Sequence, residues 1–203
     1  MKLNLPTKIT LVRIFMIPIF VLVFFLDTLG EMRFLIAAIV FALAAATDAL
    51  DGHIARSRGL VTNLGKFLDP IADKVLVSTA MILLLAAKEE FFGVFGGYQE
   101  ITYIAVAVAV CIIMARELII SAFRQIAAVN GVIMAADKLG KLKTIFQDVS
   151  LVAYLAGAAF AYSSIGVAIL YLATAAFAIA TILTVWSGIA YVVNNSQVLK
   201  DTN

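Results

Sequence analysis

Residues 48–56 read DALDGHIAR, and residues 65–73 read GKFLDPIAD. These two stretches hold four aspartates between apolar runs of the chain: Asp48, Asp51, Asp69 and Asp73. Ionised carboxylates are costly beside hydrocarbon and are kept there when they serve a site. Four carboxylates beside apolar segments therefore need a binding partner or a polar environment that offsets their cost.

The composition is that of a membrane protein. The chain has 203 residues, of which 64% are hydrophobic and 14% are charged, and its mean hydropathy is +1.06. A soluble domain carries about 25% charged residues. This chain has more apolar surface than its own core could bury, so we expect an integral membrane protein with no nucleic-acid partner.

Six apolar stretches follow one another along the chain. They cover residues 9–26, 34–47, 75–87, 101–115 with a weaker continuation over 118–129, 149–162 and 165–193. A spanning helix needs roughly 20 residues, and the second and third stretches are shorter than that. Each must therefore extend into the aspartate motif. We predict an all-α fold over residues 1–203, with six transmembrane helices around a cytoplasm-facing polar cavity and an interfacial segment at residues 1–8.

The positive charges favour one orientation of these six spans. With a cytoplasmic N-terminus, all 15 lysines and arginines except Arg33 and Lys88 fall on the inner side, as the positive-inside rule requires. We therefore expect a multi-pass cell-membrane protein with both termini and the polar cavity on the cytoplasmic side. The outer loops at 27–33 and 88–100 are predicted to be merely connective, and the uncharged sixth span to be a packing or dimer helix.

The aspartate spacing predicts a metal site. Asp48 and Asp51 are three residues apart and Asp69 and Asp73 four apart, so on helices each pair shares a face. Four neighbouring carboxylates repel one another unless divalent cations neutralise them. All-oxygen ligands suit Mg²⁺ or Mn²⁺, and two such ions over phosphates indicate phosphoryl-type transfer.

Physical chemistry suggests a role for two further residues of the motif and limits where a third fits in a helix. Gly52 allows a ligand to approach the backbone closely, and Arg56 suits bidentate binding of a phosphate. Pro70 fits a helix that begins close to Asp69 or is kinked there.

The pattern D-x2-D-G-x2-A-R-x8-G-x3-D-x3-D resembles the signature of the CDP-alcohol phosphotransferase family. All its fixed positions match, namely Asp48, Asp51, Gly52, Ala55, Arg56, Gly65, Asp69 and Asp73. Other segments are similar to the phosphatidylglycerophosphate synthase branch: NLPT at 4–7 with Thr10 and Arg13, RELIISAFR at 116–124, and GKLKT at 140–144 with Gln147.

The resemblance implies a homodimer of six-helix subunits in phospholipid biosynthesis, in which CDP-diacylglycerol and sn-glycerol 3-phosphate give phosphatidylglycerophosphate and CMP. It implies two Mg²⁺ or Mn²⁺ ions on Asp48, Asp51, Asp69 and Asp73, with Asp73 also the general base. CDP-diacylglycerol would be bound by Asn4, Thr7, Gly52, Arg56 and Thr62. The acceptor's phosphate, which calls for cations, is assigned to Arg116, Arg124, Lys141 and Lys143.

Several alternatives stay open at the level of sequence. The same signature would serve a synthase that uses inositol phosphate, serine or phosphatidylglycerol as acceptor. A membrane cation transporter also keeps carboxylates in its spans, although near the midplane and on interrupted helices. Arg116 and Glu117 could form a structural ion pair, and the inner lysines could be topology signals only.

Overall fold

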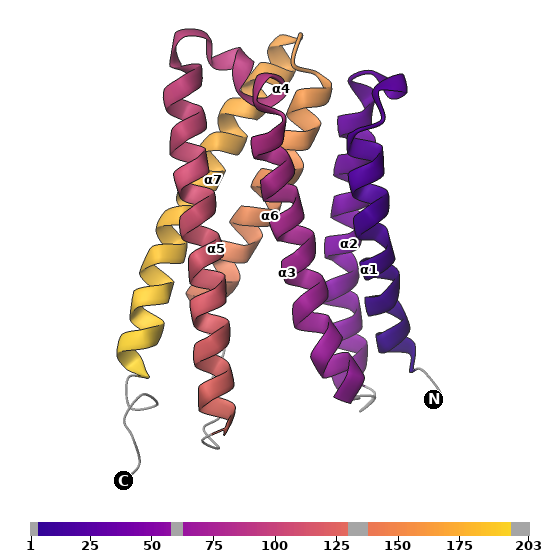
Figure 1. Cartoon of the computed structure of the whole chain (residues 1–203), viewed down its shortest axis with the longest axis vertical. Coiled ribbons are helices and arrows are strands. Elements are labelled where there is room, and N and C mark those ends of the chain that lie inside the picture. The colour runs from indigo at the N-terminus through magenta and orange to yellow at the C-terminus, as the bar shows by residue number, and fades with distance from the viewer. Residues whose placement is uncertain (1–3, 58–62, 130–137, 196–203) are drawn as a thin grey trace.

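The computed structural model describes residues 4–57, 63–129 and 138–195, apart from the side chains at positions 6, 48–57, 63, 66, 128, 129 and 138. These residues contain no strand and form six long helices (Figure 1): α1 (Leu5–Phe24), α2 (Met32–Ser57), α3 (Asn63–Ala86), α5 (Gln99–Val129), α6 (Lys138–Ala159) and α7 (Ser164–Asn194). Three short helices complete them: η1 (Asp27–Leu29), α4 (Lys88–Phe92) and η2 (Gly93–Tyr98). The predicted all-α class is confirmed.

Both halves of the aspartate motif are helical. α2 runs for 26 residues, from the second apolar stretch through Asp48 and Asp51 to Ser57. α3 begins at Asn63, ahead of Asp69 and Asp73, and continues for 24 residues. The predicted extension of these helices into the motif is therefore confirmed. Of the two alternatives for Pro70, a helix start close to Asp69 is wrong, because Pro70 lies about two turns inside α3; a kink at this position stays a prediction.

Among the described residues, three helical segments have the length and composition of membrane spans, and one of them covers α4, η2 and most of α5. Thr7–Phe24, Lys88–Ala127 and Ser164–Asn194 are long and apolar enough to cross a bilayer, with mean hydropathies of 2.1, 2.3 and 2.2. Met32–Thr47 is a shorter apolar helix segment. α2 and α3 each contain motif aspartates beside an apolar part, and α6 begins with lysines. The uninterrupted apolar part of each of these three helices is therefore shorter than the helix itself.

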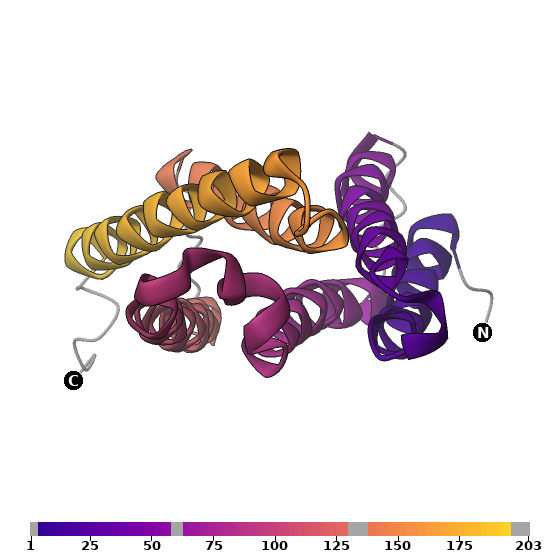
Figure 2. The same ribbon diagram turned by 90° about the horizontal axis from the view of Figure 1, so that it is seen from above.

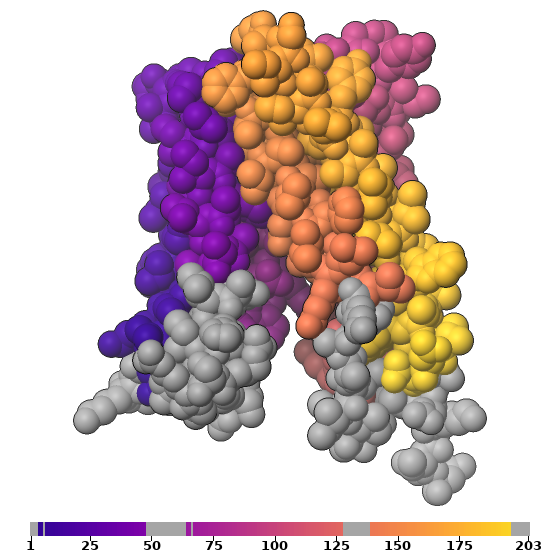
Figure 3. Space-filling view, turned by 180° about the vertical axis from the view of Figure 1, so that it is seen from behind, coloured from indigo at the N-terminus to yellow at the C-terminus, as the bar shows by residue number. Residues whose placement is uncertain are grey.

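The helices form two groups that meet in the middle of the molecule. α1 packs along α2 and also against α3, α6 packs along α7, and α5 packs against α7. The contact of α2 with α6 joins the two groups. Seen from above, α3 and α5 lie on one side and α6 and α7 on the other, while α4 and η2 cross from α3 to α5 (Figure 2). The space-filling view shows the two groups separating toward the lower end (Figure 3).

The opposite end is closed by aromatic rings. Phe91 and Phe92 of α4 are fully buried. The Phe91 ring lies 5.5 Å from that of Phe34 on α2 and 6.2 Å from that of Tyr154 on α6, between ring centroids. Aromatic side chains bury large areas and favour such edge-to-face pairs. The prediction that the 88–100 loop is merely connective is therefore wrong, because this segment supplies part of the core.

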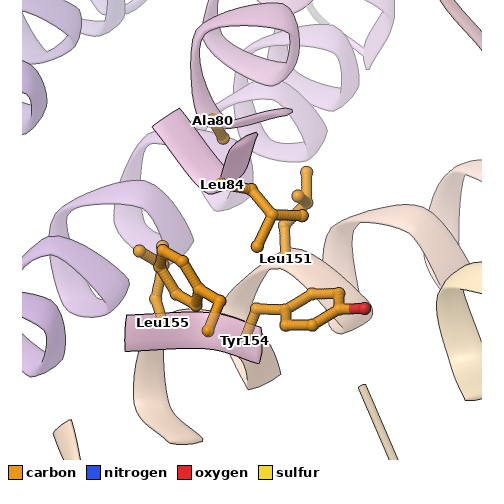
Figure 4. A pocket seen from close by; sticks show the side chains of 6 residues that line it. Ala80, Leu84, Leu151, Tyr154 and Leu155 are labelled. Atoms are coloured by element: carbon orange, nitrogen blue, oxygen red, sulfur yellow. The ribbon is translucent and has the colours of Figure 1, made fainter. Parts of the chain in front are cut away.

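A small hollow beside the aromatic rings is also part of this packing (Figure 4). It lies between α3, α4 and α6, and its lining residues are Ala80, Leu84, Phe91, Leu151, Tyr154 and Leu155. The only polar side-chain atom among them, the Tyr154 hydroxyl, donates a hydrogen bond to Thr174 Oγ1 at 2.9 Å. An apolar hollow of this kind holds no charged substrate, so the functional site lies elsewhere.

We expect Phe91→Ala to lower the free energy of unfolding by about 3 kcal/mol or more, because it leaves a cavity in the aromatic end of the core. Thermal unfolding of the purified protein in detergent measures the loss. Phe15→Ala is the matched control, since Phe15 on α1 is 68% exposed and its removal leaves no cavity. Equal losses in the two variants would contradict a core role for α4.

Candidate functional site

The aspartate motif lies at the end where the two helix groups separate. The start of α1, the end of α2, the start of α3, the end of α5 and the start of α6 all lie at the lower end in Figure 1. Asp48, Asp51, Gly52 and Arg56 belong to the last turns of α2 by backbone position. Thr62 lies outside the described residues.

A fully buried arginine joins the three helices that surround the motif. Arg13 of α1 is 0% exposed, and its Nη1 lies 3.4 Å from Asp69 Oδ1 on α3. Its Nε donates to Thr47 Oγ1 on α2 at 3.1 Å, one residue before Asp48. A charged side chain buried this deeply is tolerated only when it is paired and hydrogen-bonded. Arg13 therefore fixes both halves of the motif relative to α1.

Sequence reasoning used Arg13 only as a basic residue and as part of a family resemblance. Its position inside the first apolar stretch was the available signal, since an ionisable residue within a span marks a functional or paired site.

The donor chemistry of the motif fits a hard divalent cation. Asp69 and Asp73 lie one turn apart on α3, and the side chain of Asp69 is 42% exposed beside its contact with Arg13. α3 packs against α2, which carries Asp48 and Asp51 on its own last turns. Every donor is a carboxylate, the ligand type of Mg²⁺ and Mn²⁺.

The side chains of Asp48 and Asp51 fall outside the description. Within the described side chains, no three His, Cys, Asp or Glu residues form a group that could hold a metal ion. The fit to a cation therefore rests on the donor types and on the two helices that carry them.

The predicted nucleotide residues of α1 lie at the same end. Asn4 is the residue that precedes the helix and is half-buried, and Thr7 is 2% exposed. Thr10 is equally buried one turn further on, followed by Arg13 after another turn. One face of α1 thus carries polar side chains into the bundle near the motif.

A second polar group, which we call the Glu117 cluster, consists of Lys74, Arg116, Glu117, Ser121, Lys143, Gln147 and Ser187. At its centre, Glu117 Oε1 accepts from Arg116 Nη1 at 3.2 Å and from Lys143 Nζ. Lys143 also donates to Gln147 Oε1 at 3.4 Å. The Arg116 and Lys143 side chains are 13% and 6% exposed. The ion pair of Arg116 with Glu117 that the sequence left open as an alternative is present. Lys143, a predicted phosphate-binding residue, also pairs with Glu117.

The outer members of the cluster link α3, α5 and α7, and Lys143 adds α6. Lys74 of α3 donates to Ser121 Oγ of α5, and Arg116 Nη2 donates to Ser187 Oγ of α7 at 3.2 Å. In the described part of the chain, the buried Nε of Arg116 has no hydrogen-bond partner. Two cations contact Glu117 and a third, Lys74, belongs to the same cluster, so the cluster as defined holds three cations and one carboxylate, a charge that suits an anionic ligand.

The other two predicted phosphate-binding residues lie apart from the cluster. Arg124 is on the exposed side of α5, about 12 Å further along the axis than Arg116. Its Nε donates to Tyr191 Oη at 3.1 Å, and its guanidinium lies 5.3 Å from the centre of that ring. Lys141 is exposed on α6. The structure thus brings together Arg116 and Lys143 from the predicted set.

Sequence reasoning missed Lys74, Ser121 and Ser187 as members of the cluster. For Ser187 a signal existed: Thr181, Thr184 and Ser187 recur every three residues in an otherwise apolar span, which places three hydroxyls on one side of a helix.

Comparisons with known proteins agree with the motif. Residues 3–188 match the family model for CDP-alcohol phosphatidyltransferase. The chain is 37% identical to CDP-diacylglycerol--glycerol-3-phosphate 3-phosphatidyltransferase from Bacillus subtilis (strain 168) over 211 aligned positions, which cover 98% of this chain and 99% of the relative. Proteins of the same name from Sodalis glossinidius (strain morsitans) and Escherichia coli (strain K12) are 38% and 36% identical, each with 94% of both chains covered.

We expect Arg13→Gln to lower the free energy of unfolding by about 2 kcal/mol, because it removes a charged hydrogen bond to Asp69 and leaves buried polar groups unpaired. Arg13→Lys should recover little of the lost stability, because an ammonium group cannot reach both Thr47 and Asp69 as the planar guanidinium does. Thermal unfolding in detergent measures both losses, with exposed Lys8→Gln on the same helix as control. A wild-type melting temperature for Arg13→Gln would contradict the role of this junction.

Proposed function

The chain belongs to the CDP-alcohol phosphatidyltransferase family, and we propose that it transfers a phosphatidyl group from CDP-diacylglycerol to sn-glycerol 3-phosphate. The products are phosphatidylglycerophosphate and CMP. Relatives that align over nearly the whole chain carry the name of this activity. The observation that carries the choice of acceptor is the Glu117 cluster, because its excess of buried positive charge suits an acceptor that itself bears a phosphate.

The aspartates provide the reaction centre in this proposal. Asp48, Asp51, Asp69 and Asp73 would hold two Mg²⁺ or Mn²⁺ ions, whose positive charge would offset the negative charge of the pyrophosphate and of the departing CMP. The Asp73 carboxylate takes the proton from the attacking hydroxyl of glycerol 3-phosphate. That oxygen bonds to the phosphorus that carries diacylglycerol, and the bond from this phosphorus to the CMP oxygen breaks.

The remaining predicted residues would bind the substrates. Asn4, Thr7, Gly52, Arg56 and Thr62 would contact the CDP moiety; the packing of α1 along α2 supports this, because it brings the start of one helix beside the end of the other. Arg116 and Lys143 would bind the acceptor's phosphate. Arg124 and Lys141 lie at the same end of the bundle and would attract anionic substrates toward it.

The architecture supports a multi-pass arrangement of one domain. Each of the six long helices has at least 20 residues, which is about the 30 Å of a bilayer core. We propose that all six cross the cell membrane, with the lysine- and arginine-rich end and both termini in the cytoplasm. We also propose a homodimer surrounded by membrane lipids.

The helix geometry disfavours the transporter alternative. Transport sites near the midplane are commonly built on interrupted helices. α2 and α3 are each continuous through their aspartates, and these aspartates lie toward one end of the bundle.

Release of CMP by the purified protein tests the proposal. We expect release from CDP-diacylglycerol with glycerol 3-phosphate, and none with serine, inositol phosphate or phosphatidylglycerol. Chelation with EDTA should abolish release and added Mg²⁺ or Mn²⁺ should restore it, because the carboxylates need cations to accept a pyrophosphate. Full activity after exhaustive chelation, preference for another acceptor, or ion flux in vesicles without CMP release would each overturn it.

We expect Asp73→Asn to lower kcat at least about a hundredfold, because general-base catalysis contributes 10²–10⁴-fold. CDP-diacylglycerol binding should persist, since the amide preserves shape and an oxygen donor. Steady-state CMP release measures the first quantity and equilibrium binding of the nucleotide lipid measures the second. Near-normal turnover would remove Asp73 from the role of base.

A further inference from the structure

α7 contacts the Glu117 cluster through two adjacent small residues. Ser187 and Gly188 are both buried on the face of α7 that packs against α5. The Ser187 hydroxyl donates to the Thr184 carbonyl at 3.3 Å, and its oxygen accepts from Arg116 Nη2 at 3.2 Å. The hydroxyl is thus oriented by its own helix so that a lone pair faces the guanidinium.

Gly188 provides the space in which the stem of Arg116 lies. A Cβ at this position would lie 3.1 Å from Arg116 Cγ and 3.6 Å from its Nε. The first distance is tighter than ordinary van der Waals contact, so any larger residue would displace the arginine. Glycine in the middle of a helix is otherwise unfavourable, and no positive φ requires it here.

We propose that Ser187 and Gly188 of α7 are positioning residues for the acceptor-phosphate site, acting through the guanidinium of Arg116. Two hydrogen bonds hold the Arg116 guanidinium in place: Nη1 donates to Glu117 and Nη2 donates to Ser187. The buried Nε is left without a hydrogen-bond partner among the described residues. A bound phosphate oxygen would satisfy it. The inference rests on the proposed function and gives α7 a part in the acceptor site beyond helix packing.

The test compares Ser187→Ala with Thr181→Ala. Thr181 lies about two turns away on α7, and among the described residues its hydroxyl bonds only to the carbonyl of Phe177 on its own helix. We expect Ser187→Ala to raise KM for glycerol 3-phosphate about tenfold, since it removes one hydrogen bond to a charged group. KM for CDP-diacylglycerol should stay unchanged. Thr181→Ala should leave both KM values at wild-type levels.

Gly188→Ala separates positioning from stability. Alanine is the better helix former, which offsets part of the cost of pressing on Arg116, so we expect the melting temperature in detergent to change little while KM for glycerol 3-phosphate increases. A double-mutant cycle then shows whether Arg116 is the intermediary. In an Arg116→Ala background, Ser187→Ala should change KM less than about twofold, because coupled residues are not additive.

The outcomes distinguish this inference from the proposed function. If wild-type protein releases CMP with glycerol 3-phosphate but Ser187→Ala and Gly188→Ala leave its KM unchanged, the inference is overturned and the function stands. Equal effects in wild-type and Arg116→Ala backgrounds would also overturn it. If wild-type protein prefers an acceptor without a phosphate, the proposed function fails and the inference fails with it.

Discussion

The buried guanidinium of Arg13 is the interaction on which the geometry of the motif depends. A cation in the middle of an apolar helix has to be paired, and Arg13 contacts residues of two other helices: Thr47 of α2 at 3.1 Å and Asp69 of α3 at 3.4 Å. Buried ion pairs add little net stability because desolvation offsets the attraction. What Arg13 does provide is a fixed separation between the end of α2 and the start of α3, the two segments that carry the aspartates.

α3 connects this junction to the Glu117 cluster. Asp69 contacts Arg13 on one side, whereas Lys74, five residues later and about 140° around the helix, contacts Ser121 of α5 on another. Asp73 comes directly before Lys74. A residue in that position lies between the proposed nucleotide side, formed by α1 and α2, and the proposed acceptor side, formed by α5, α6 and α7. This intermediate place suits the proposed role of Asp73 as a base, which would have to reach the acceptor hydroxyl beside the pyrophosphate.

Charge and apolar length predicted much of this arrangement from the sequence. Stretches too short to span implied that α2 and α3 run into the motif, and both do. The role of the 88–100 segment could not be predicted, because hydropathy does not tell whether Phe91 and Phe92 face lipid or fold back onto Tyr154. The spacing of Thr181, Thr184 and Ser187 indicated a polar side of the last helix, but it could not show that Arg116 of α5 donates a hydrogen bond to Ser187.

Different interactions hold the two ends of the bundle together: aromatic packing at one end, and ion pairs and hydrogen bonds at the end that carries the candidate site. At the aromatic end, dispersion and edge-to-face ring contacts draw the helices together and need no polar partner. At the other end, Arg13 and the Glu117 cluster hold helices through hydrogen bonds and ion pairs between single side chains. A closed apolar end thus keeps the helices assembled, while ion pairs at the polar end hold cations and carboxylates near one another, as the proposed binding of a charged lipid headgroup and a phosphate acceptor would require.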